Sequence, residues 1–175
     1  METCIKISFV ISSMRAGGAE RVLSLLANAL SSKGYEVTIF SFDRETEVPF
    51  YSLNKSIKWL PLNLLRESRS SFEGMKNNIK RITALRRSIL REQPEVVVSF
   101  MDMTNIVTII ALSGSKIPII ICDHTDPKHA QLTRTWKILR RVFYPRAKKL
   151  VVLTKEFADL KITGVHKIKS DNCIS

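Results

Sequence analysis

Short apolar runs alternate along the chain with longer segments of helical periodicity. Apolar, β-branched runs predict buried strands, and apolar residues at every third or fourth position predict amphipathic helices. Strands are therefore expected at residues 5–11, 36–42, 57–62, 95–100, 118–122 and 150–153. Helices are expected at residues 20–33, 75–92, 105–112, 133–144 and 155–160.

This alternation predicts the fold class. Strands that are apolar throughout belong to parallel sheets with helices on both faces. Right-handed crossovers then give a doubly wound, mostly parallel, Rossmann-like α/β domain. Pro61 in the third strand indicates a sheet edge or a strand end. Ligands of such folds bind at the carboxyl ends of the strands, so we expect a site in the loops after Ile11, Phe100, Cys122 and Leu153.

The first of these loops contains a glycine pair, Gly17 and Gly18, just before the helix expected at 20–33. Glycine lets a backbone approach a ligand closely, and a helix N-terminus favours anions through its free N–H groups and its dipole. The spacing does not match the G-x-G-x-x-G dinucleotide fingerprint. An anion site and a tight turn without a ligand are therefore equally open interpretations. Gly34 is expected to end the helix.

The net charge of +12 and the pI of about 9.9 change this picture. A chain with this excess of positive charge indicates an anionic partner, such as nucleic acid, an acidic membrane surface or a phosphorylated substrate. The longest apolar runs, such as 106–112, are much shorter than the ~20 residues that span a bilayer. Any membrane contact is therefore expected to be peripheral, and the N-terminus does not resemble a signal peptide.

The three cysteines, Cys4, Cys122 and Cys173, are widely spaced and match no metal-binding pattern. Cys4 and Cys122 lie in or beside apolar strand-like runs. We therefore expect buried free thiols, as in a protein of the reducing cytosol. No metal site is predicted.

His124 directly follows the strand that ends at Cys122, and Asp123 and Asp126 lie close to it in sequence. A histidine in this position is a candidate catalytic or ligand-orienting residue. Residue type alone favours the alternative, a hydrogen-bonded histidine in a surface loop.

The loop after Phe100 contains three further polar candidates. Asp102 or Thr104 is expected to cap the following helix with its side chain. Asn105 could face the cleft, although its spacing does not require this.

Two basic segments contain no acidic residue, 74–91 and 127–155. In the first segment, a helical wheel separates a basic face from an apolar face. The basic face comprises Lys76, Lys80, Arg87 and Arg91. The apolar face comprises Ile79, Ile82, Leu85 and Ile89. Arg86 intrudes on the apolar side, so we expect it to have a specific partner. The second segment includes Arg140 and Arg141 beside apolar Trp136.

Two solvated helix faces are the simplest interpretation of these segments, but solvated faces usually mix both signs of charge. An acidic membrane attracts each nearby Lys or Arg by about 1 kcal/mol, so several of them could hold the domain at a bilayer. Nucleic acid would use the same charge, but no helix-turn-helix, zinc or RNA-binding signature accompanies it. A nucleic-acid partner is therefore the least favoured interpretation.

Four stretches together resemble family 4 of the retaining glycosyltransferases, which have the GT-B fold. They are residues 7–22, with Gly17-Gly18-Ala19-Glu20-Arg21, and residues 94–100, 123–125 and 150–154. The resemblance covers nearly the whole chain. The sequence is most similar to bacterial enzymes that extend lipid-linked oligosaccharides, including N-acetylgalactosamine transferases.

The resemblance implies two Rossmann-like domains around a cleft, with the acceptor on the N-terminal domain and the nucleotide sugar on the C-terminal one. It implies that Gly17 and Gly18 lie against the donor diphosphate or the transferred sugar. His124 would be the catalytic residue near the reacting carbon. Transfer would retain the anomeric configuration without a metal or a cofactor, from a nucleotide sugar of the UDP-linked type.

The resemblance also implies a polyprenyl-diphosphate-linked glycan as acceptor, in bacterial glycan or polysaccharide biosynthesis. Arg and Lys side chains bind diphosphates well, and the residues expected to bind the acceptor or the membrane are Lys76, Lys80, Arg86, Arg87, Arg140 and Arg141. Such an enzyme is expected in the cytoplasm, peripheral on the inner face of the cytoplasmic membrane.

Family members continue through a hinge into the donor domain, whereas this sequence ends at Ser175. Residues 1–165 are expected to form the acceptor-side domain and residues 166–175 a hinge remnant, with the nucleotide-sugar domain absent. Asn172-Cys173-Ile174 lacks the proline of the expected Asn-Pro-Ile hinge motif. The chain alone is then expected to have little or no transferase activity. The alternative is a non-catalytic, anion- or membrane-binding Rossmann module.

Overall fold

The computed structural model describes residues 4–65, 71–123 and 134–152. The strands are β1 (Lys6–Ile11), β2 (Glu36–Ser41), β3 (Lys58–Pro61), β4 (Val96–Phe100), β5 (Ile119–Asp123) and β6 (Lys149–Val152). The helices are α1 (Gly18–Ser32), α2 (Ser71–Glu92), α3 (Asp102–Ala111) and α4 (Arg134–Phe143), followed by the short 3₁₀ helix η1 (Tyr144–Arg146).

All six strands form one parallel sheet in the order β3-β2-β1-β4-β5-β6. β1 pairs with β2 on one side and β4 on the other, so that Val10 lies in register with both Phe40 and Ser99. The chain moves outward from β1 to β3, returns through α2, and moves outward again from β4 to β6. The predicted doubly wound fold is confirmed, and Pro61 lies on the edge strand β3, as expected.

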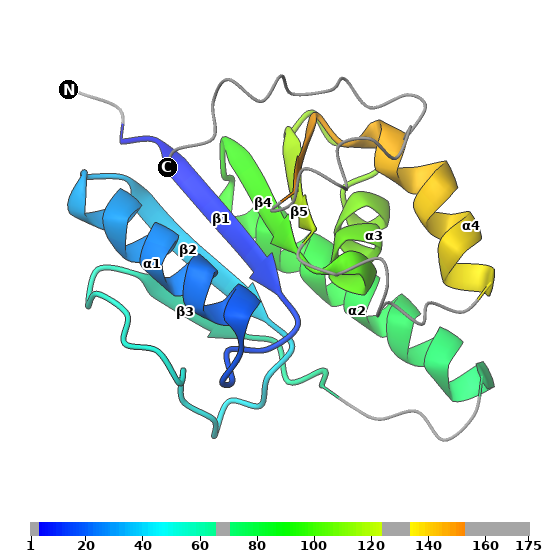
Figure 1. The fold of residues 1–175 in the computed structure, drawn as a ribbon, viewed down its shortest axis with the longest axis horizontal. Helices are drawn as coiled ribbons and strands as arrows, with labels where there is room; N and C mark the ends of the chain where they lie inside the picture. The colour runs from blue at the N-terminus through cyan, green and yellow to red at the C-terminus, as the bar shows by residue number, and fades with distance from the viewer. Residues whose placement is uncertain (1–3, 66–70, 124–133, 153–175) are drawn as a thin grey trace.

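Helices cover both faces of the sheet (Figure 1). On one face, Ala19, Leu23 and Ala27 of α1 pack at four-residue spacing against apolar residues of β1 and β2. On the other face, α2, α3 and η1 share a core with the opposite side of the same strands, to which Leu85 and Ile106 belong. Because both faces are covered, the strands are apolar on both sides rather than alternating.

Most predicted elements agree with the observed ones within a few residues. α1 ends before Gly34, which has a φ of +88° and so adopts the left-handed conformation that glycine tolerates best. α3 starts at Asp102, three residues before its predicted start. The helix expected at 155–160 lies outside the described residues.

One part of the helical-wheel prediction for α2 is wrong. Leu85 and Ile89 are fully buried, but Ile79, assigned to the same apolar face, is 57% exposed. Figure 1 shows that the N-terminal half of α2 extends beyond the sheet. The periodicity identified the apolar face of the helix, but not how far the core extends along it.

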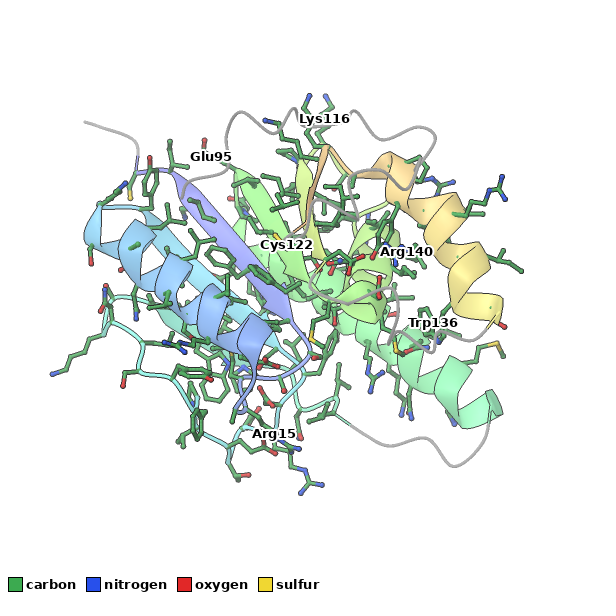
Figure 2. The ribbon with its side chains drawn as sticks, viewed as in Figure 1. Arg15, Glu95, Lys116, Cys122, Trp136 and Arg140 are labelled. Carbon is green, nitrogen blue, oxygen red and sulfur yellow. The ribbon has the colours of Figure 1, made fainter. Side chains whose placement is uncertain are left out.

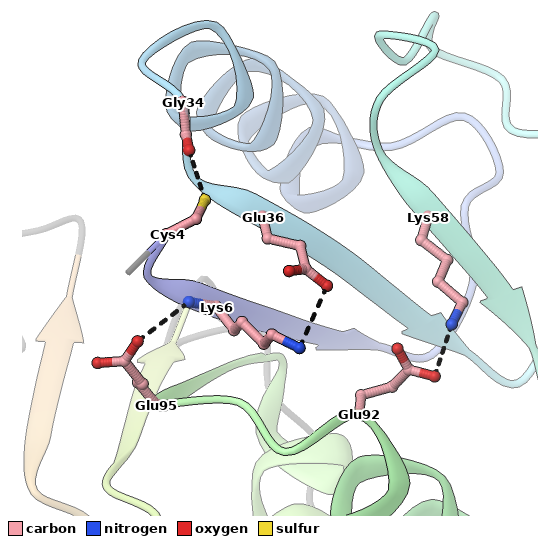
Figure 3. Close-up of polar contacts among 7 residues, drawn as sticks. All are labelled: Cys4, Lys6, Gly34, Glu36, Lys58, Glu92 and Glu95. Atoms are coloured by element: carbon pink, nitrogen blue, oxygen red, sulfur yellow. Dashed lines mark hydrogen bonds and ion pairs between the residues drawn. The ribbon is translucent and has the colours of Figure 1, made fainter. Parts of the chain in front are cut away.

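The amino ends of the strands are joined by polar contacts (Figure 3). Lys58 Nζ lies 2.6 Å from Glu92 Oε1, and this ion pair links β3 to the end of α2. Cys4 is exposed and its thiol donates to the Gly34 carbonyl, so the prediction that it is buried is wrong. Cys122 is a buried free thiol, as predicted, and Cys173 lies outside the described residues.

None of the helices formed by the described residues is long and apolar enough to cross a membrane.

Candidate functional site

The order of the strands places the loops after β1 and β4 next to each other. The chain leaves these two neighbouring strands in opposite directions. Doubly wound folds bind their ligands at such a switch point, in the crevice outside the carboxyl ends of the strands. Ser12 Oγ lies 3.5 Å from Met101 Sδ, so the two loops are in contact. The glycine turn predicted from the sequence is therefore part of this crevice.

The glycine turn begins α1, and its two glycines differ in their surroundings. Gly17 is the N-cap with a φ of 179°, an extended conformation open to any residue. A Cβ at Gly17 would nevertheless overlap the carboxylate of Glu20, with the Glu20 Cδ only 2.8 Å away. A Cβ at Gly18 would meet nothing within 4 Å. A side chain at Gly17 would thus displace the flexible carboxylate of Glu20, whereas Gly18 borders open space.

Hydrogen bonds from the segment after β2 hold the glycine turn in place. Asp43 Oδ2 accepts a 2.7 Å bond from the Met14 N–H, and Tyr51 donates a 3.1 Å bond to the Gly17 carbonyl. Burial raises the pKa of Asp43, and this effect outweighs the opposing hydrogen bonds from Ser41 and from the Met14 N–H. Sequence reasoning missed Asp43, although its place just after a buried strand was a usable signal.

A buried polar network connects the carboxyl ends of β4 and β5 to α4 and η1. Tyr144 Oη donates a 2.8 Å hydrogen bond to Asp102 Oδ1. Arg140 lies between two carboxylates, with Nη1 3.1 Å from Asp102 Oδ1 and Nη2 2.7 Å from Asp123 Oδ2. Figure 2 shows Arg140 reaching from α4 toward the end of β5 near Cys122. The guanidinium therefore compensates two aspartates that follow neighbouring strands.

This network corrects two predictions for the loop after β4. The N-cap of α3 is Met101, and no side chain caps the helix, so neither Asp102 nor Thr104 does so. Asp102 lies in the first turn and binds Tyr144 and Arg140 instead. Asn105 does not face an open cleft, because it is fully buried and its Nδ2 donates to the Cys122 carbonyl.

The electrostatics of the network favour a structural role. Burial, together with the charges of Asp123 and Asp102, raises the pKa of Tyr144 far above its ordinary value. The Tyr144 hydroxyl therefore stays protonated and remains a donor. Burial and the Asp123 carboxylate also raise the pKa of Cys122 to about 12, so its thiol is not a nucleophile at neutral pH. The network holds the ends of β4 and β5 beside the crevice.

The structure places the remaining predicted site residues as follows. Lys76, Lys80, Arg87 and Arg141 are exposed on α2 and α4. Arg86 has the specific partner expected of it, since its Nη1 donates to the Ala111 and Ser113 carbonyls at 2.6 and 3.0 Å. His124 lies outside the described residues, next to Asp123. Among the described residues, no group of three or more His, Cys, Asp or Glu side chains could hold a metal ion.

A cavity of about 740 Å³ opens elsewhere, beside the loop 113–118 and the segment 145–148. These residues precede β5 and β6, so the cavity lies at the amino ends of the strands. Figure 2 shows Lys116 from this region at the opposite end of the molecule from Arg15 of the glycine turn. This cavity is therefore separate from the loops after β1 and β4, which the strand order brings together at the carboxyl ends.

Fold and crevice together define a Rossmann-like domain of the kind found in GT-B glycosyltransferases. Sucrose-phosphate synthase from Thermosynechococcus elongatus superposes with a TM-score of 0.73 at 13% identity, over 92% of this chain and 45% of that one. A lipopolysaccharide outer core galactosyltransferase gives a TM-score of 0.64 at 15% identity, over 93% and 44%. At these identities the likeness concerns the fold alone.

The sequence narrows this class to one family. The model of Glycosyltransferase Family 4 matches residues 16–169, and the chain belongs to that family. A Campylobacter jejuni relative is 38% identical over 149 residues, which are 85% of this chain. It is a GalNAc-α-(1→4)-GalNAc-α-(1→3)-diNAcBac-PP-undecaprenol α-1,4-N-acetyl-D-galactosaminyltransferase. The match covers 40% of the length of that relative.

Proposed function

We propose that this chain is the acceptor-side domain of a retaining glycosyltransferase. In the complete enzyme a sugar would pass from a nucleotide-sugar donor, of the UDP-linked type, to a glycan carried on a polyprenyl diphosphate. The observation that carries this proposal is the 38% identity to the Campylobacter N-acetylgalactosaminyltransferase over 85% of this chain. A shared fold alone would not select a substrate, but identity at this level favours the same class of acceptor.

The crevice supplies what such a domain needs. At Gly17 and Gly18 the backbone lines the edge of the crevice without a side chain. Gly18 leaves room for the donor phosphate or the transferred sugar. His124 follows Asp123 in sequence. Asp123 ends β5, which β4 separates from β1, and Arg140 holds its carboxylate in place. We assign His124 the contact with the reacting part of the substrates.

Transfer exchanges one bond at the anomeric carbon for another. The bond to the nucleoside diphosphate breaks, and the acceptor hydroxyl oxygen takes its place with the same anomeric configuration. The acceptor proton leaves with the diphosphate, so charge and atoms balance without a redox partner or a resident cofactor.

Exposed side chains on α2 and α4 suit an acceptor embedded in a membrane. Lys76 and Lys80 lie beside Met75 and Ile79, both of which are 57% exposed. On α4, the exposed Arg141 lies next to Val142, which is 51% exposed. Basic residues interleaved with apolar ones are the pattern of helices that lie on anionic bilayers. We propose that these faces hold the domain peripherally at the cytoplasmic face of the membrane.

A chimera tests the transferase assignment. This chain would replace the matched 149 residues of the Campylobacter enzyme, and transfer from UDP-N-acetylgalactosamine to an undecaprenyl-diphosphate-linked glycan would be measured. We expect transfer by the chimera, strong loss in its His124→Ala variant, and little or none by the 175-residue chain alone. A folded chimera without transfer would contradict the assignment. Turnover by the chain alone would contradict the need for a second domain.

Liposome flotation tests the membrane assignment separately. We expect the chain to float with phosphatidylglycerol vesicles at low salt and not with phosphatidylcholine vesicles. A Lys76→Glu/Lys80→Glu variant should lose flotation, whereas Lys33→Glu/Lys55→Glu, with the same change of charge on exposed lysines elsewhere, should keep it. If the two variants floated to the same extent, the position of the lysines would have no effect on membrane binding, and the assignment of α2 would fail.

A further inference from the structure

The cavity at the amino ends of β5 and β6 lies outside the crevice and has no part in the proposed transfer. Its volume is about 740 Å³, within the range of about 300–1,000 Å³ that is usual for small-molecule sites. Two neighbouring segments form its walls, the loop 113–118 before β5 and the segment 145–148 before β6. The Lys148 N–H donates a 2.8 Å hydrogen bond to the Ile119 carbonyl, which joins the two segments.

Every charged side chain among the described residues that line this cavity is basic. Lys116, Arg146 and Lys148 line it, and all three are exposed. None of them forms an ion pair with a carboxylate of a described residue. The sequence contains no Asp or Glu in residues 103–122 or 127–155. An anion in the cavity therefore meets three positive charges and no carboxylate from these walls.

Two contacts hold the basic walls in position. The Arg146 guanidinium carbon lies 4.9 Å from the centroid of the Phe143 ring, and this cation–π contact restricts the side chain. Arg86 donates to the Ala111 and Ser113 carbonyls, which fixes the start of the loop before β5. A site with walls already in position loses less conformational freedom when a ligand binds.

Ser115 carries a buried hydroxyl that the fold leaves unmatched. It lines the cavity, and its Oγ has no hydrogen-bond partner in the part of the chain that the structure describes. An unmatched buried polar group commonly marks the position of a water, an ion or a ligand, and a serine hydroxyl can donate to an anion. A Cβ at the preceding Gly114 would meet nothing within 4 Å, so the loop borders open space there.

The rest of the wall includes apolar side chains. Ile109 and Leu112, at the end of α3, line the cavity together with Ile117 and Ile119. Inorganic phosphate would pair with the cations but would leave this apolar surface in contact with water. A phosphate that carries an apolar group would pair its charge and bury apolar surface in the same cavity.

We infer that this cavity binds a phosphate ester with an apolar or aromatic group. Lys116, Arg146 and Lys148 bind the phosphate, the Ser115 hydroxyl donates to it, and the apolar wall receives the attached group. This site goes beyond the proposed function and does not depend on it. Two sources share the chemistry of the ligand, a soluble phosphate ester and the headgroup of an anionic lipid.

The course of α2 favours the soluble source. At the end of this helix, Glu92 pairs with Lys58 at the amino end of β3. The N-terminal half of α2, with Lys76 and Lys80, therefore lies toward the carboxyl ends of the strands. A bilayer that contacts those lysines is then at the other end of the sheet from the cavity.

The test is NMR of the ¹⁵N-labelled chain, titrated separately with 1-naphthyl phosphate, inorganic phosphate and uncharged 1-naphthol. The Gly114, Lys116 and Ala147 amides report on the cavity, and the Gly18 amide reports on the crevice. We expect 1-naphthyl phosphate to shift the three cavity amides. Inorganic phosphate and 1-naphthol should bind there at least about tenfold more weakly, because each lacks one half of the interactions.

Variants separate the cavity from the net charge of the chain. Lys116→Ala/Lys148→Ala should bind 1-naphthyl phosphate about tenfold more weakly. The control Lys33→Ala/Lys55→Ala removes two exposed lysines elsewhere and should bind as the wild type does. Ser115→Ala changes no charge and should weaken binding by about threefold to tenfold. Circular dichroism confirms that each variant is folded.

Flotation with phosphatidic acid vesicles separates the two sources of phosphate. With a soluble ester as ligand, Lys116→Ala/Lys148→Ala loses affinity for 1-naphthyl phosphate but floats as the wild type does, and this is the expected result. Loss of flotation as well would identify the ligand as a lipid headgroup.

Four results would overturn the inference. One is a titration in which 1-naphthyl phosphate shifts Gly18 but none of the cavity amides, or shifts nothing. Another is equal weakening in the lysine double variant and its control, because net charge alone would then explain binding. Equal affinity for inorganic phosphate would exclude an ester with an apolar group, and unchanged affinity in Ser115→Ala would exclude the assigned contact. The chimera tests the transferase assignment separately, so its activity is independent of all four.

Discussion

Tyr144 and Asp102 are joined by a buried 2.8 Å hydrogen bond although 42 residues separate them in sequence. Tyr144 begins the turn after α4, and Asp102 begins α3. The bond therefore fixes the end of α4 to the loop that follows β4. Arg140 also lies over the Tyr144 ring, with its guanidinium carbon 4.9 Å from the ring centroid, so a cation–π contact holds Tyr144 as well.

Removing the hydroxyl should destabilise the protein, because Asp102 would lose a donor in a buried site. We expect Tyr144→Phe to lower the free energy of unfolding by about 1–3 kcal/mol, measured by urea denaturation. Tyr51→Phe removes a hydroxyl that bonds a partly buried carbonyl, and should cost about 1 kcal/mol or less. Equal stabilities of wild type and Tyr144→Phe would show that the hydrogen bond contributes nothing.

The charge of Arg140 should matter more than its hydrogen bonds. Arg140→Met leaves Asp102 and Asp123, whose side chains are 5% and 0% exposed, without their shared counter-charge. Breaking a buried ion pair on one side costs about 3–5 kcal/mol. Arg141→Met, at the neighbouring exposed position, should change stability by no more than about 0.5 kcal/mol. Similar losses in both variants would contradict the assigned role of the network.

The two glycines of the turn should respond in opposite ways to the same substitution. Gly18→Ala places a methyl group in open space at a helical position and should stabilise by about 0.5–1 kcal/mol. Gly17→Ala displaces the Glu20 carboxylate and should destabilise by about 1 kcal/mol. In the Gly17→Ala/Glu20→Ala double variant the two effects should not add, because one removes the obstacle to the other. If thermal denaturation showed that the stability changes of the two single variants simply add, the overlap between a side chain at position 17 and the Glu20 carboxylate would be contradicted.

The stability contributed by Asp43 should depend on pH in a defined direction. Its pKa in the folded state is raised above the ordinary 3.8, chiefly by burial. The folded state therefore holds this proton more tightly than the unfolded state. The favourable contribution is full below the ordinary pKa and is lost as pH rises through the raised one.

Asp43→Asn removes this titration while keeping an oxygen to accept from the Met14 N–H. The stability of the variant relative to the wild type should therefore increase with pH above about 3.9 and level off beyond the raised pKa. Urea denaturation of both proteins between about pH 3 and pH 7 provides the difference curve. A curve that falls with pH would mean that the folded state stabilises the charged carboxylate.

Arg86 and the lysines of α2 should separate stability from membrane binding. Arg86→Met removes two hydrogen bonds to the end of α3 and should cost about 1–3 kcal/mol, while flotation with anionic vesicles is unchanged. Lys76→Glu/Lys80→Glu should do the reverse, since both lysines are exposed. Loss of flotation in folded Arg86→Met would instead place this guanidinium on the lipid.

The sequence was sufficient to predict the layers and the switch point of the sheet, because both follow from local patterns. Apolar runs identified the strands, and their alternation with helices required a parallel sheet with a switch point. Gly17 and Gly18 follow β1 in sequence, so their place in the crevice followed directly. Pro61 identified its edge strand because a missing N–H restricts where it can lie.

The contacts that shape the crevice could not be predicted in this way. The link between Asp102 and Tyr144, and that between Asp123 and Arg140, depend on how α4 packs, which no local pattern specifies. Asp102 has the residue type of a cap, so propensity favoured the wrong role. Likewise, only the backbone course of the turn shows that Glu20 folds over Gly17.

α3 connects two parts of the molecule that have different tasks. Its C-terminal end is bound by Arg86 from α2, and its N-terminal end carries Asp102 beside the crevice. Its 10 residues rise by about 15 Å at the usual helical pitch. The two ends of this short helix are therefore fixed independently, one by Arg86 and the other by Tyr144 and Arg140.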